Sequence, residues 1–396
     1  MKIITRAVWI LSLVSLFTDT ASEMLYPIMP LYLKSIGFSI VLIGILEGIA
    51  EAVAGLSKGY FGKLSDATGR RMPFVQWGYA LSALSKPMMA FFVAPLWVFF
   101  VRTFERVGKG LRTGARDAVL SDESTPATKG KVFGFHRSMD TLGAVLGPLF
   151  ALLYLRWHPE DYKTLFFIAF IPGIIAVVCS LLLKDKKIVV KSNKSKPSFF
   201  SFLGYWKESP EVYRKLVIGL LIFTLFNSSD IFLLLQAKQA GLNDSSIITI
   251  YIFYNLVFVI FAFPVGILAD KIGLKKIFIY GLFIFVIVYG GMAFAKLPIH
   301  FYILFFLYGV YASATEGISK AWISNISAKE NTATAIGTYS AFQSICTMLA
   351  SSLAGIIWFA FGSKTTFLLS AIMVFAVVIY ISLFVREKVA MQEVAQ

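Results

Sequence analysis

The chain alternates between apolar segments long enough to cross a membrane and short polar turns. A membrane-spanning helix needs about 20 apolar residues, and a hydropathy reading finds about twelve such segments in the 396 residues. Hydrophobic residues make up 58% of the chain and charged residues only 15%. A soluble domain of this length would be far less apolar. We therefore predict an all-α membrane protein.

A short charged sequence between two apolar segments recurs half a chain later. The first copy contains Gly62, Asp66, Gly69, Arg70 and Arg71, and the second contains Gly266, Asp270, Gly273 and Lys275. One offset of 204 residues aligns the glycines and the aspartates of the two copies without a gap. A repeat built around a charged turn between apolar helices is typical of transporters made of two pseudo-symmetric halves.

Both copies follow the pattern Gly-x-Leu-x-Asp-x-x-Gly, with Arg or Lys two residues later. This pattern resembles the loops between helices 2 and 3 and between helices 8 and 9 of major facilitator superfamily transporters. The resemblance implies twelve transmembrane helices in two pseudo-symmetric six-helix bundles. We expect the N-terminal bundle over residues 1–184, a basic cytoplasmic linker over 185–214 and the C-terminal bundle over 215–396.

The repeated turn is also expected to control the opening and closing of the transporter. We predict that Asp66 lies at the cytoplasmic start of the third helix, where a carboxylate is favourable. We further predict that it pairs with Arg112 or Arg116, so that all three belong to one conformational motif.

The chain has a net charge of +15, and the positions of its basic residues agree with the expected membrane topology. Lys and Arg gather in alternate loops and in the middle linker, so the positive-inside rule places both termini and the linker in the cytoplasm. The charge therefore does not indicate nucleic-acid binding. We expect a multi-pass, monomeric protein of the plasma membrane, the inner membrane of a bacterium, whose partners are the bilayer, a small-molecule solute and protons.

Carboxylates lie deep in the first two apolar segments, expected over residues 6–33 and 40–61. Asp19 and Glu23 are four residues apart, so they share one face of a helix, and Glu47 and Glu51 repeat this spacing. An ionised side chain at that depth costs about 3 kcal/mol or more. Two carboxylates on one face repel each other, so one of them should hold a proton. The predicted proton-coupling residues are Asp19, Glu23, Glu47, Glu51 and Asp140.

The family resemblance also implies a central cavity lined by helices 1, 4, 7 and 10. Carried over to this chain, it assigns the substrate cavity to Tyr26, Arg102, Glu105, Arg106, His136, Asp230, Glu316, Tyr339 and Gln343. The alternative is that buried charges form structural ion pairs between helices, and it stays open for Glu47, Glu51, Lys86, His136, Arg137 and Asp140.

Two further patterns suggest the direction of transport. The Arg106-x-x-x-Gly110 spacing and the Gly143-x-x-x-Gly147-Pro148 sequence resemble motifs of exporters and antiporters in the family, although small residues also permit close helix packing. The first helix with Pro27, the Glu105-Arg106-x-Gly108-Lys109-Gly110 sequence and the Phe135-His136-Arg137-x-Met139-Asp140 sequence together resemble bacterial efflux-type permeases. We predict a secondary active transporter that works by alternating access, and proton-coupled export, by antiport, of a cationic or amphipathic compound.

Other functions stay open. Arg102, Arg106 and Lys109 could bind an organic anion, such as an organophosphate, a carboxylate or a siderophore. A transition-metal exporter and a membrane receptor without transport activity are less favoured. The sequence contains no zinc-protease motif and no phosphate-binding loop after a strand, so we expect no enzymatic activity, no cofactor and no resident metal.

Overall fold

The computed structural model describes residues 4–26, 28–185 and 197–385, and in these ranges the regular structure is entirely helical. The all-α prediction is therefore confirmed for the described part of the chain. The helices are α1 (Arg6–Leu25), α2 (Met29–Ser35), α3 (Ile40–Thr68), α4 (Met72–Phe91), α5 (Pro95–Asp122), α6 (Lys129–Trp157), α7 (Tyr162–Leu181), α8 (Tyr205–Glu208), α9 (Glu211–Phe226), α10 (Ile231–Gln239), α11 (Asp244–Ile272), α12 (Leu274–Met292), α13 (Pro298–Ile326) and α14 (Thr332–Phe384), with short 3-10 turns at Ser201–Gly204 and Lys329–Asn331.

These elements account for the twelve predicted helices. The predicted eleventh and twelfth helices both lie in α14, which is bent at Gly362, where φ is 84°. The short α8 and the 3-10 turn before it lie in the predicted linker. Lys194 and the other linker residues over 186–196 lie outside the described residues.

Two predicted helices are interrupted, which corrects the expectation that each is continuous. The first is divided into α1 and α2, and the sequence between them contains Pro27, a residue without an amide donor. The seventh is divided into α9 and α10 at residues 227–230. There the amide of Ser229 donates to the hydroxyl of Ser351 at 3.4 Å. Short polar side chains compete in this way with the helical hydrogen bonds.

The internal repeat extends to the ends of the helices. Ser39 accepts a hydrogen bond from the amide of Leu42 at 3.2 Å, and Asn243, 204 residues later, accepts one from the amide of Ser246 at 2.8 Å. Gly69 and Gly273 end α3 and α11 with φ of 62° and 106°, values that favour glycine. The offset read from the sequence therefore relates equivalent structural positions.

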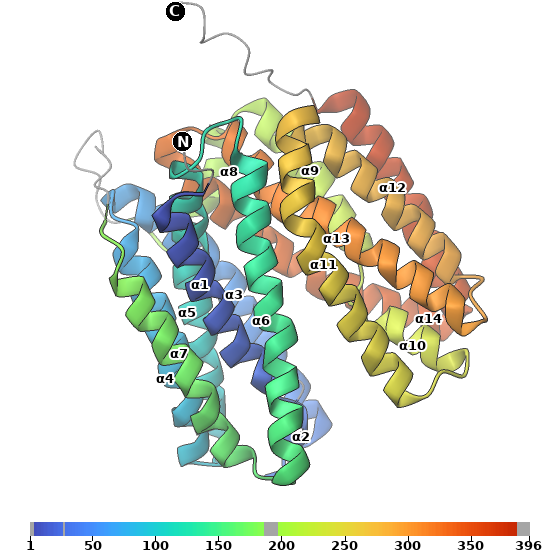
Figure 1. The fold of residues 1–396 in the computed structure, drawn as a ribbon. Helices are drawn as coiled ribbons and strands as arrows, with labels where there is room; N and C mark the ends of the chain where they lie inside the picture. The colour runs from blue at the N-terminus through green and yellow to red at the C-terminus, as the bar shows by residue number, and fades with distance from the viewer. Residues whose placement is uncertain (1–3, 27, 186–196, 386–396) are drawn as a thin grey trace, which may run out of the picture. The chain divides into compact units, whose positions relative to one another are not determined.

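The described residues divide into two compact units. The N-terminal unit comprises the described parts of Met1–Glu123, Met139–Lys207 and Ala328–Ser344, and the C-terminal unit those of Ser124–Ser138, Glu208–Ser327 and Ile345–Gln396. Within the N-terminal unit, α1, α4, α5 and α7 run side by side (Figure 1). Within the C-terminal unit, α13 packs against α11 and α12. This division differs from the predicted bundles at two segments, 124–138 and 328–344, and the predicted domain boundaries stay a prediction.

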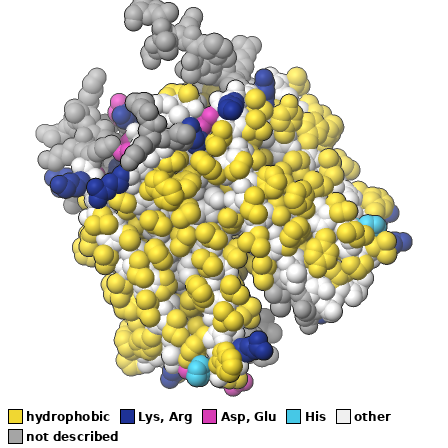
Figure 2. Space-filling view, viewed as in Figure 1, with side chains coloured by type: hydrophobic (Ala, Val, Ile, Leu, Met, Phe, Trp, Pro, Cys, Tyr) yellow, Lys and Arg dark blue, Asp and Glu magenta, His cyan; other side chains and the backbone are white. Residues whose placement is uncertain are grey.

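The surface and the length of the helices fit a membrane protein. In the part of the chain that the structure describes, eight helical stretches are long and apolar enough to cross a membrane. Hydrophobic side chains cover the middle of the visible face in Figure 2, whereas Lys and Arg gather near its upper and lower edges. Helix α5 is not among the eight, because charged residues interrupt its apolar sequence.

Candidate functional site

The N-terminal unit contains a cavity between α1, α4 and α5, which we call the N-terminal cavity. Its lining includes six residues that the sequence assigned to proton coupling or to the substrate. These are Asp19, Glu23, Tyr26, Arg102, Glu105 and Arg106. Three further cations, Lys86, Lys109 and Arg112, also line it. The structure thus brings together residues from three helices that are separate in the sequence.

Helix α5 supplies most of the charge because its charged residues share one face. Positions 102, 105, 106, 109 and 112 follow the three- and four-residue spacing of a helix face. Glycines allow this helix to approach its neighbours closely. A Cβ added to Gly108 would lie 2.9 Å from the carbonyl oxygen of Gly78 on α4, and one added to Gly110 would lie 2.2 Å from Cβ of Ser57 on α3.

Glu105 joins two cations of the cavity. Lys86 of α4 forms an ion pair with one carboxylate oxygen, and Nη1 of Arg102 lies 2.8 Å from the other. Lys86 and Arg102 are only 3% and 6% exposed, so this carboxylate neutralises two nearly buried charges. Lys86 also donates to the hydroxyl of Ser22 on α1 at 3.1 Å. The cluster therefore connects α1, α4 and α5.

The remaining cations have different surroundings. Arg106 lies 3.4 Å from the carboxylate of Glu51 on α3, so this predicted proton-coupling residue forms an ion pair. Arg112 donates to the hydroxyl of Ser82 and lies over the ring of Tyr79, 4.8 Å from its centroid.

The cavity carries an excess of positive charge. Five cations line it (Lys86, Arg102, Arg106, Lys109 and Arg112), against three carboxylates (Asp19, Glu23 and Glu105). With all of them ionised, the lining has a net charge of 5 − 3 = +2.

Glycines of α6 bring a further carboxylate to α1. A Cβ added to Gly143 would lie 2.4 Å from the carbonyl oxygen of Leu16 and 3.0 Å from Cβ of Asp19. At this close approach the carboxyl groups of Asp19 and Asp140 interact electrostatically. Two neighbouring carboxylates repel each other. The glycines of the Gly143-x-x-x-Gly147 motif thus serve close packing.

Asp140 is connected to α5 as well. It accepts a hydrogen bond from Ser15 at 2.5 Å, and Nη1 of Arg116 donates to the same hydroxyl at 3.2 Å. Arg116 also pairs with Asp117 at 2.9 Å. A continuous polar network therefore runs from Arg116 to the carboxyl pair beside the cavity.

The structure places the other predicted site residues elsewhere. Asp230 accepts hydrogen bonds from Tyr254 and from Tyr308, the latter at 2.5 Å, and Glu316 forms an ion pair with Arg137, all in the C-terminal unit. His136 is buried in the same unit. Tyr339 and Gln343 belong to the N-terminal unit, and among the described residues they are not part of the cavity lining. The side chain of Glu47 lies outside the described residues.

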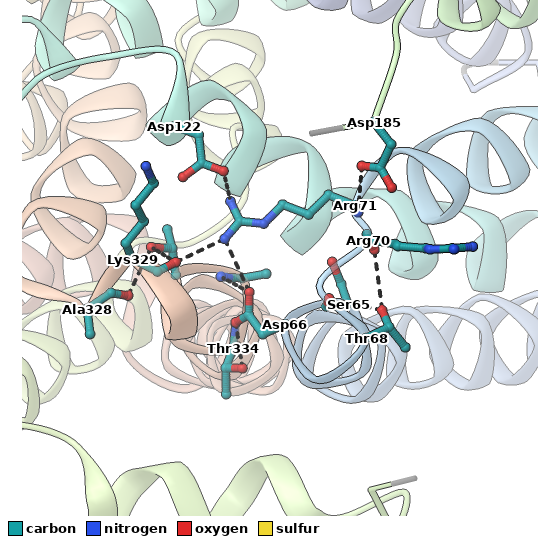
Figure 3. A network of polar contacts seen from close by, with 12 residues as sticks. Ser65, Asp66, Thr68, Arg70, Arg71, Asp122, Asp185, Ala328, Lys329 and Thr334 are labelled. Carbon is teal, nitrogen blue, oxygen red and sulfur yellow. Dashed lines mark hydrogen bonds and ion pairs between the residues drawn. The ribbon is translucent and has the colours of Figure 1, made fainter. Parts of the chain in front are cut away.

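The repeated turn forms a second polar cluster, the Asp66 network. The carboxylate of Asp66 accepts hydrogen bonds from the amide and the hydroxyl of Thr334, at 2.6 and 2.8 Å, at the beginning of α14 (Figure 3). Arg71 lies 3.4 Å from Asp66 and 2.6 Å from Asp122, and it donates to the carbonyl of Lys329 at 3.0 Å. The turn is thus bound to a segment about 260 residues later.

This geometry corrects the predicted environment of Asp66. The residue lies in the last turn of α3, not at the start of the following helix, and it interacts with the N-terminus of α14. The predicted pair with Arg112 or Arg116 is wrong, since Arg112 contacts Ser82 and Arg116 contacts Asp117. Asp66 was expected after the end of the second predicted helix, but that helix continues to Thr68 and therefore includes Asp66.

The second copy of the turn repeats this arrangement in the C-terminal unit. Asp270 accepts hydrogen bonds from the amides of Gly130 and Lys131, at 2.7 and 2.8 Å, at the beginning of α6. In each copy the aspartate therefore satisfies free amides at a helix N-terminus, where negative charge is favourable. The other basic residues of the turns lie apart from these carboxylates. Lys275, for example, donates to the carbonyls of Ser382 and Val385.

Glycines in both copies allow the helices to touch through their backbones. A Cβ on Gly62 of α3 would lie 2.4 Å from the carbonyl oxygen of Ala333, and one on Gly266 of α11 would lie 2.3 Å from that of Gly130. Real Cβ atoms do not approach so closely, so a larger residue at either position would separate the helices.

We predict that the Asp66 network stabilises the arrangement in which α3 contacts α14. Asp66→Asn removes the charge from its hydrogen bonds to Thr334 and should weaken this contact by about 1 kcal/mol, roughly a fivefold change in population. Cysteines placed at the beginning of α14 should then react faster with a membrane-impermeant thiol reagent.

Asp185→Asn is a matched control. Asp185 accepts hydrogen bonds from the amides of Arg71 and Met72 at the start of α4, both at 3.1 Å, but has no contact with α14 among the described interactions. Equal reaction rates in the wild type and in Asp66→Asn would contradict the predicted role.

Lys86 and Arg112 are the cations of the cavity lining that the sequence analysis did not assign to the substrate. A signal was present for Lys86, since it lies within an apolar helix, where an unpaired cation is unfavourable. The sequence could not show that they face the same cavity as Glu23, because this depends on how α1, α4 and α5 pack.

Comparisons with known proteins agree with this architecture. The model of the Major Facilitator Superfamily matches residues 11–253 and 216–395. An uncharacterized MFS-type transporter of Methanocaldococcus jannaschii is 31% identical over 376 residues, which cover 93% of this chain and 92% of the relative. Citrate exporter 1 of Aspergillus niger is 25% identical over 187 residues, 45% of this chain and 33% of that protein. The crystal structure of the human organic anion transporter MFSD10 (TETRAN) aligns with a TM-score of 0.82 at 14% identity, covering 95% of this chain and 98% of that one.

Proposed function

The chain belongs to the Major Facilitator Superfamily of transporters, and we propose that it carries an organic anion through the N-terminal cavity by alternating access. The observation that supports this proposal is the excess of cations over carboxylates in the cavity lining. Arg and Lys side chains bind carboxylates and phosphates through charge-assisted hydrogen bonds, which are stronger away from bulk water. An organic cation would meet five like charges in the same place.

This proposal replaces the cationic substrate favoured by the sequence with the anionic alternative. The cationic substrate was predicted because acidic residues slightly outnumber basic ones in the predicted membrane helices. The structure adds Lys86, Lys109 and Arg112 to the lining formed by Asp19, Glu23, Arg102, Glu105 and Arg106, which changes its net charge from 2 − 3 = −1 to 5 − 3 = +2. The name of the citrate exporter agrees with an organic anion and with export, and it makes citrate a suitable first test compound.

We further propose that transport is coupled to protons through the carboxyl groups of α1. The close approach of α6 to α1 beside Asp19 supports this proposal, because it brings the carboxyl groups of Asp19 and Asp140 together near the cavity, and two neighbouring carboxylates favour the binding of a proton. A carboxyl group that gains and loses a proton changes the cost of excluding water around it, which couples protonation to conformation. The proposed setting is a bacterial inner membrane, with a monomeric protein whose termini are both cytoplasmic.

Transport in proteoliposomes tests the proposed substrate class. We expect saturable uptake of radiolabelled citrate or of another organic anion by the purified protein. Lys109→Gln should reduce uptake at least tenfold at subsaturating anion, because it removes a cation from the lining. This loss corresponds to about 1.4 kcal/mol.

Lys215→Gln removes the same charge from an exposed ion pair with Glu211 in the C-terminal unit and should leave uptake unchanged. Saturable uptake of an organic cation but of no anion would contradict the proposed substrate class and restore the cationic one.

A further inference from the structure

We propose that the linker turn Ser201–Gly204 is a detachable latch, which docks beside α3 and completes the contact between α3 and the beginning of α14. The ring of Phe202 is fully buried, although this residue lies in the linker. Helix α3, the turn and residues 332–344 of α14 all belong to the N-terminal unit. The latch acts in the same way whichever solute the chain carries.

Three contacts hold the turn in place. The Phe202 ring fills the space beside Gly59 of α3, where an added Cβ would lie 2.6 Å from two ring carbons. Nζ of Lys63, one turn later on α3, donates to the carbonyl of Ser201 at 2.6 Å. The hydroxyl of Thr338 on α14 donates to the carbonyl of Phe202 at 3.4 Å. The turn is therefore bound by both helices, and the ring fits because residue 59 has no side chain.

The second copy of the repeat contains the equivalent contact, between α11 and α6. A Cβ added to Gly134 of α6 would lie 2.5 Å from the carbonyl oxygen of Ala262 on α11. In the first copy, a Cβ added to Gly337 of α14 would lie 2.4 Å from the carbonyl oxygen of Lys58 on α3. The two carbonyls are 204 residues apart in the sequence, and the two glycines are 203 residues apart. The two contacts can therefore be compared residue by residue.

The two copies differ in the origin of the ring that closes the contact. In the second copy, Phe263 of α11 packs edge to face against Phe135 of α6, with ring centroids 5.6 Å apart. By the same two offsets, the equivalent residues of the first copy are Gly59 and Thr338, which have no ring. Phe202 supplies the ring instead. The first contact is thus closed by a side chain that belongs to neither helix.

This difference makes the first contact dependent on the linker. Fully burying a phenylalanine side chain stabilises a contact by about tenfold or more in population. The turn can leave with its ring while α3 and α14 keep their helical structure, whereas Phe263 and Phe135 cannot leave their helices. Gly59 lies about two helical turns before Asp66, so the latch and the Asp66 network hold the same two helices at separate points.

Thiol labelling of the full-length protein tests the latch. Ser344→Cys places a reporter on α14, where the native hydroxyl accepts a hydrogen bond from Lys58 of α3 at 3.0 Å. Cys179→Ser and Cys346→Ser remove the other thiols. With Phe202→Ala, we expect the reporter to react about tenfold faster with a membrane-impermeant thiol reagent, because the buried ring no longer stabilises the contact.

Phe200→Ala is the matched control. It removes the same side chain from the residue just before the turn, where the ring is 56% exposed. The reporter should then react as fast as it does with the native linker. Equal rates with and without Phe202→Ala would overturn the proposed latch.

Gly59→Phe separates a latch from a general loss of stability. With the native turn present, the new Cβ would collide with the Phe202 ring, so the reporter should react faster. In Phe202→Ala, the new ring can take the place of the missing one, as Phe263 does in the second copy, and the reaction should slow toward the original rate. A faster reaction in both backgrounds would overturn the latch, because a ring at this place would then not close the contact.

Gly59→Ala gives a further measure in which no buried side chain is removed. Its Cβ alone would lie 2.6 Å from the Phe202 ring, so the turn should be displaced and the reporter should react faster. In Phe202→Ala the same substitution meets no ring and should change the rate little. An equal acceleration in the two backgrounds would also contradict the latch, since the effect of Gly59→Ala would then not pass through Phe202.

Discussion

Replacing Glu105 by Gln should lower the free energy of unfolding by about 3–5 kcal/mol, the loss typical when one partner of a buried ion pair is removed. Lys86 and Arg102 would keep their charges but lose the carboxylate that both contact. Both are nearly buried, so water cannot replace this carboxylate without opening the contacts between α4 and α5. The midpoint of thermal unfolding in detergent and the free energy of unfolding in mixed micelles both measure the effect.

A double variant identifies the cause of this loss. Lys86→Met removes one of the two unpaired cations, so Glu105→Gln combined with Lys86→Met should recover part of the lost stability. Glu211→Gln, which breaks an exposed pair with Lys215, should change the stability little. A Glu105→Gln protein as stable as the wild type would show that Lys86 and Arg102 are solvated, and that the cluster is not structural.

Replacing Gly62 by Val should reduce transport by about 10- to 100-fold. The new Cβ would lie 2.4 Å from the carbonyl oxygen of Ala333, so α3 and the beginning of α14 must separate. Forcing extra atoms into a close contact costs about 1–3 kcal/mol, and every 1.4 kcal/mol changes a population tenfold. The contact should therefore form too rarely for efficient alternation. Initial rates of transport in proteoliposomes provide the measurement.

A glycine in the second copy of the turn tests whether the prediction holds there as well, and a glycine elsewhere in the C-terminal unit serves as the control. Gly266→Val, in the second copy, would place a Cβ 2.3 Å from the carbonyl oxygen of Gly130 and should have a similar effect. Gly290→Val, within α12, adds the same side chain where no atom lies within 4 Å of the new Cβ, so transport should continue. Normal transport by Gly62→Val would mean that the close contact is not needed in the cycle.

Local features of this chain were predictable from the sequence because they depend on residues close together along it. Apolar length gave the helices, the 204-residue offset gave the repeat, and the spacing of Arg102, Glu105 and Arg106 gave one charged face of α5. The interruption of the seventh helix at residues 227–230 was not predicted. Hydropathy averages over about 19 residues and does not resolve a break of a single turn.

Tertiary structure alone decided which charges meet. Asp66 and Thr334 are 268 positions apart, and Asp19 and Asp140 approach each other only because Gly143 lets α6 touch α1. Spacing shows which residues share a helix face but not which helix lies opposite, because that depends on small residues at backbone contacts and on packing over the whole unit. The sequence by itself determined the membrane helices, the repeat and the family resemblance. The sign of the cavity's charge, and with it the proposed anionic substrate, was decided by the packing that turns Lys86, Lys109 and Arg112 toward Asp19 and Glu23.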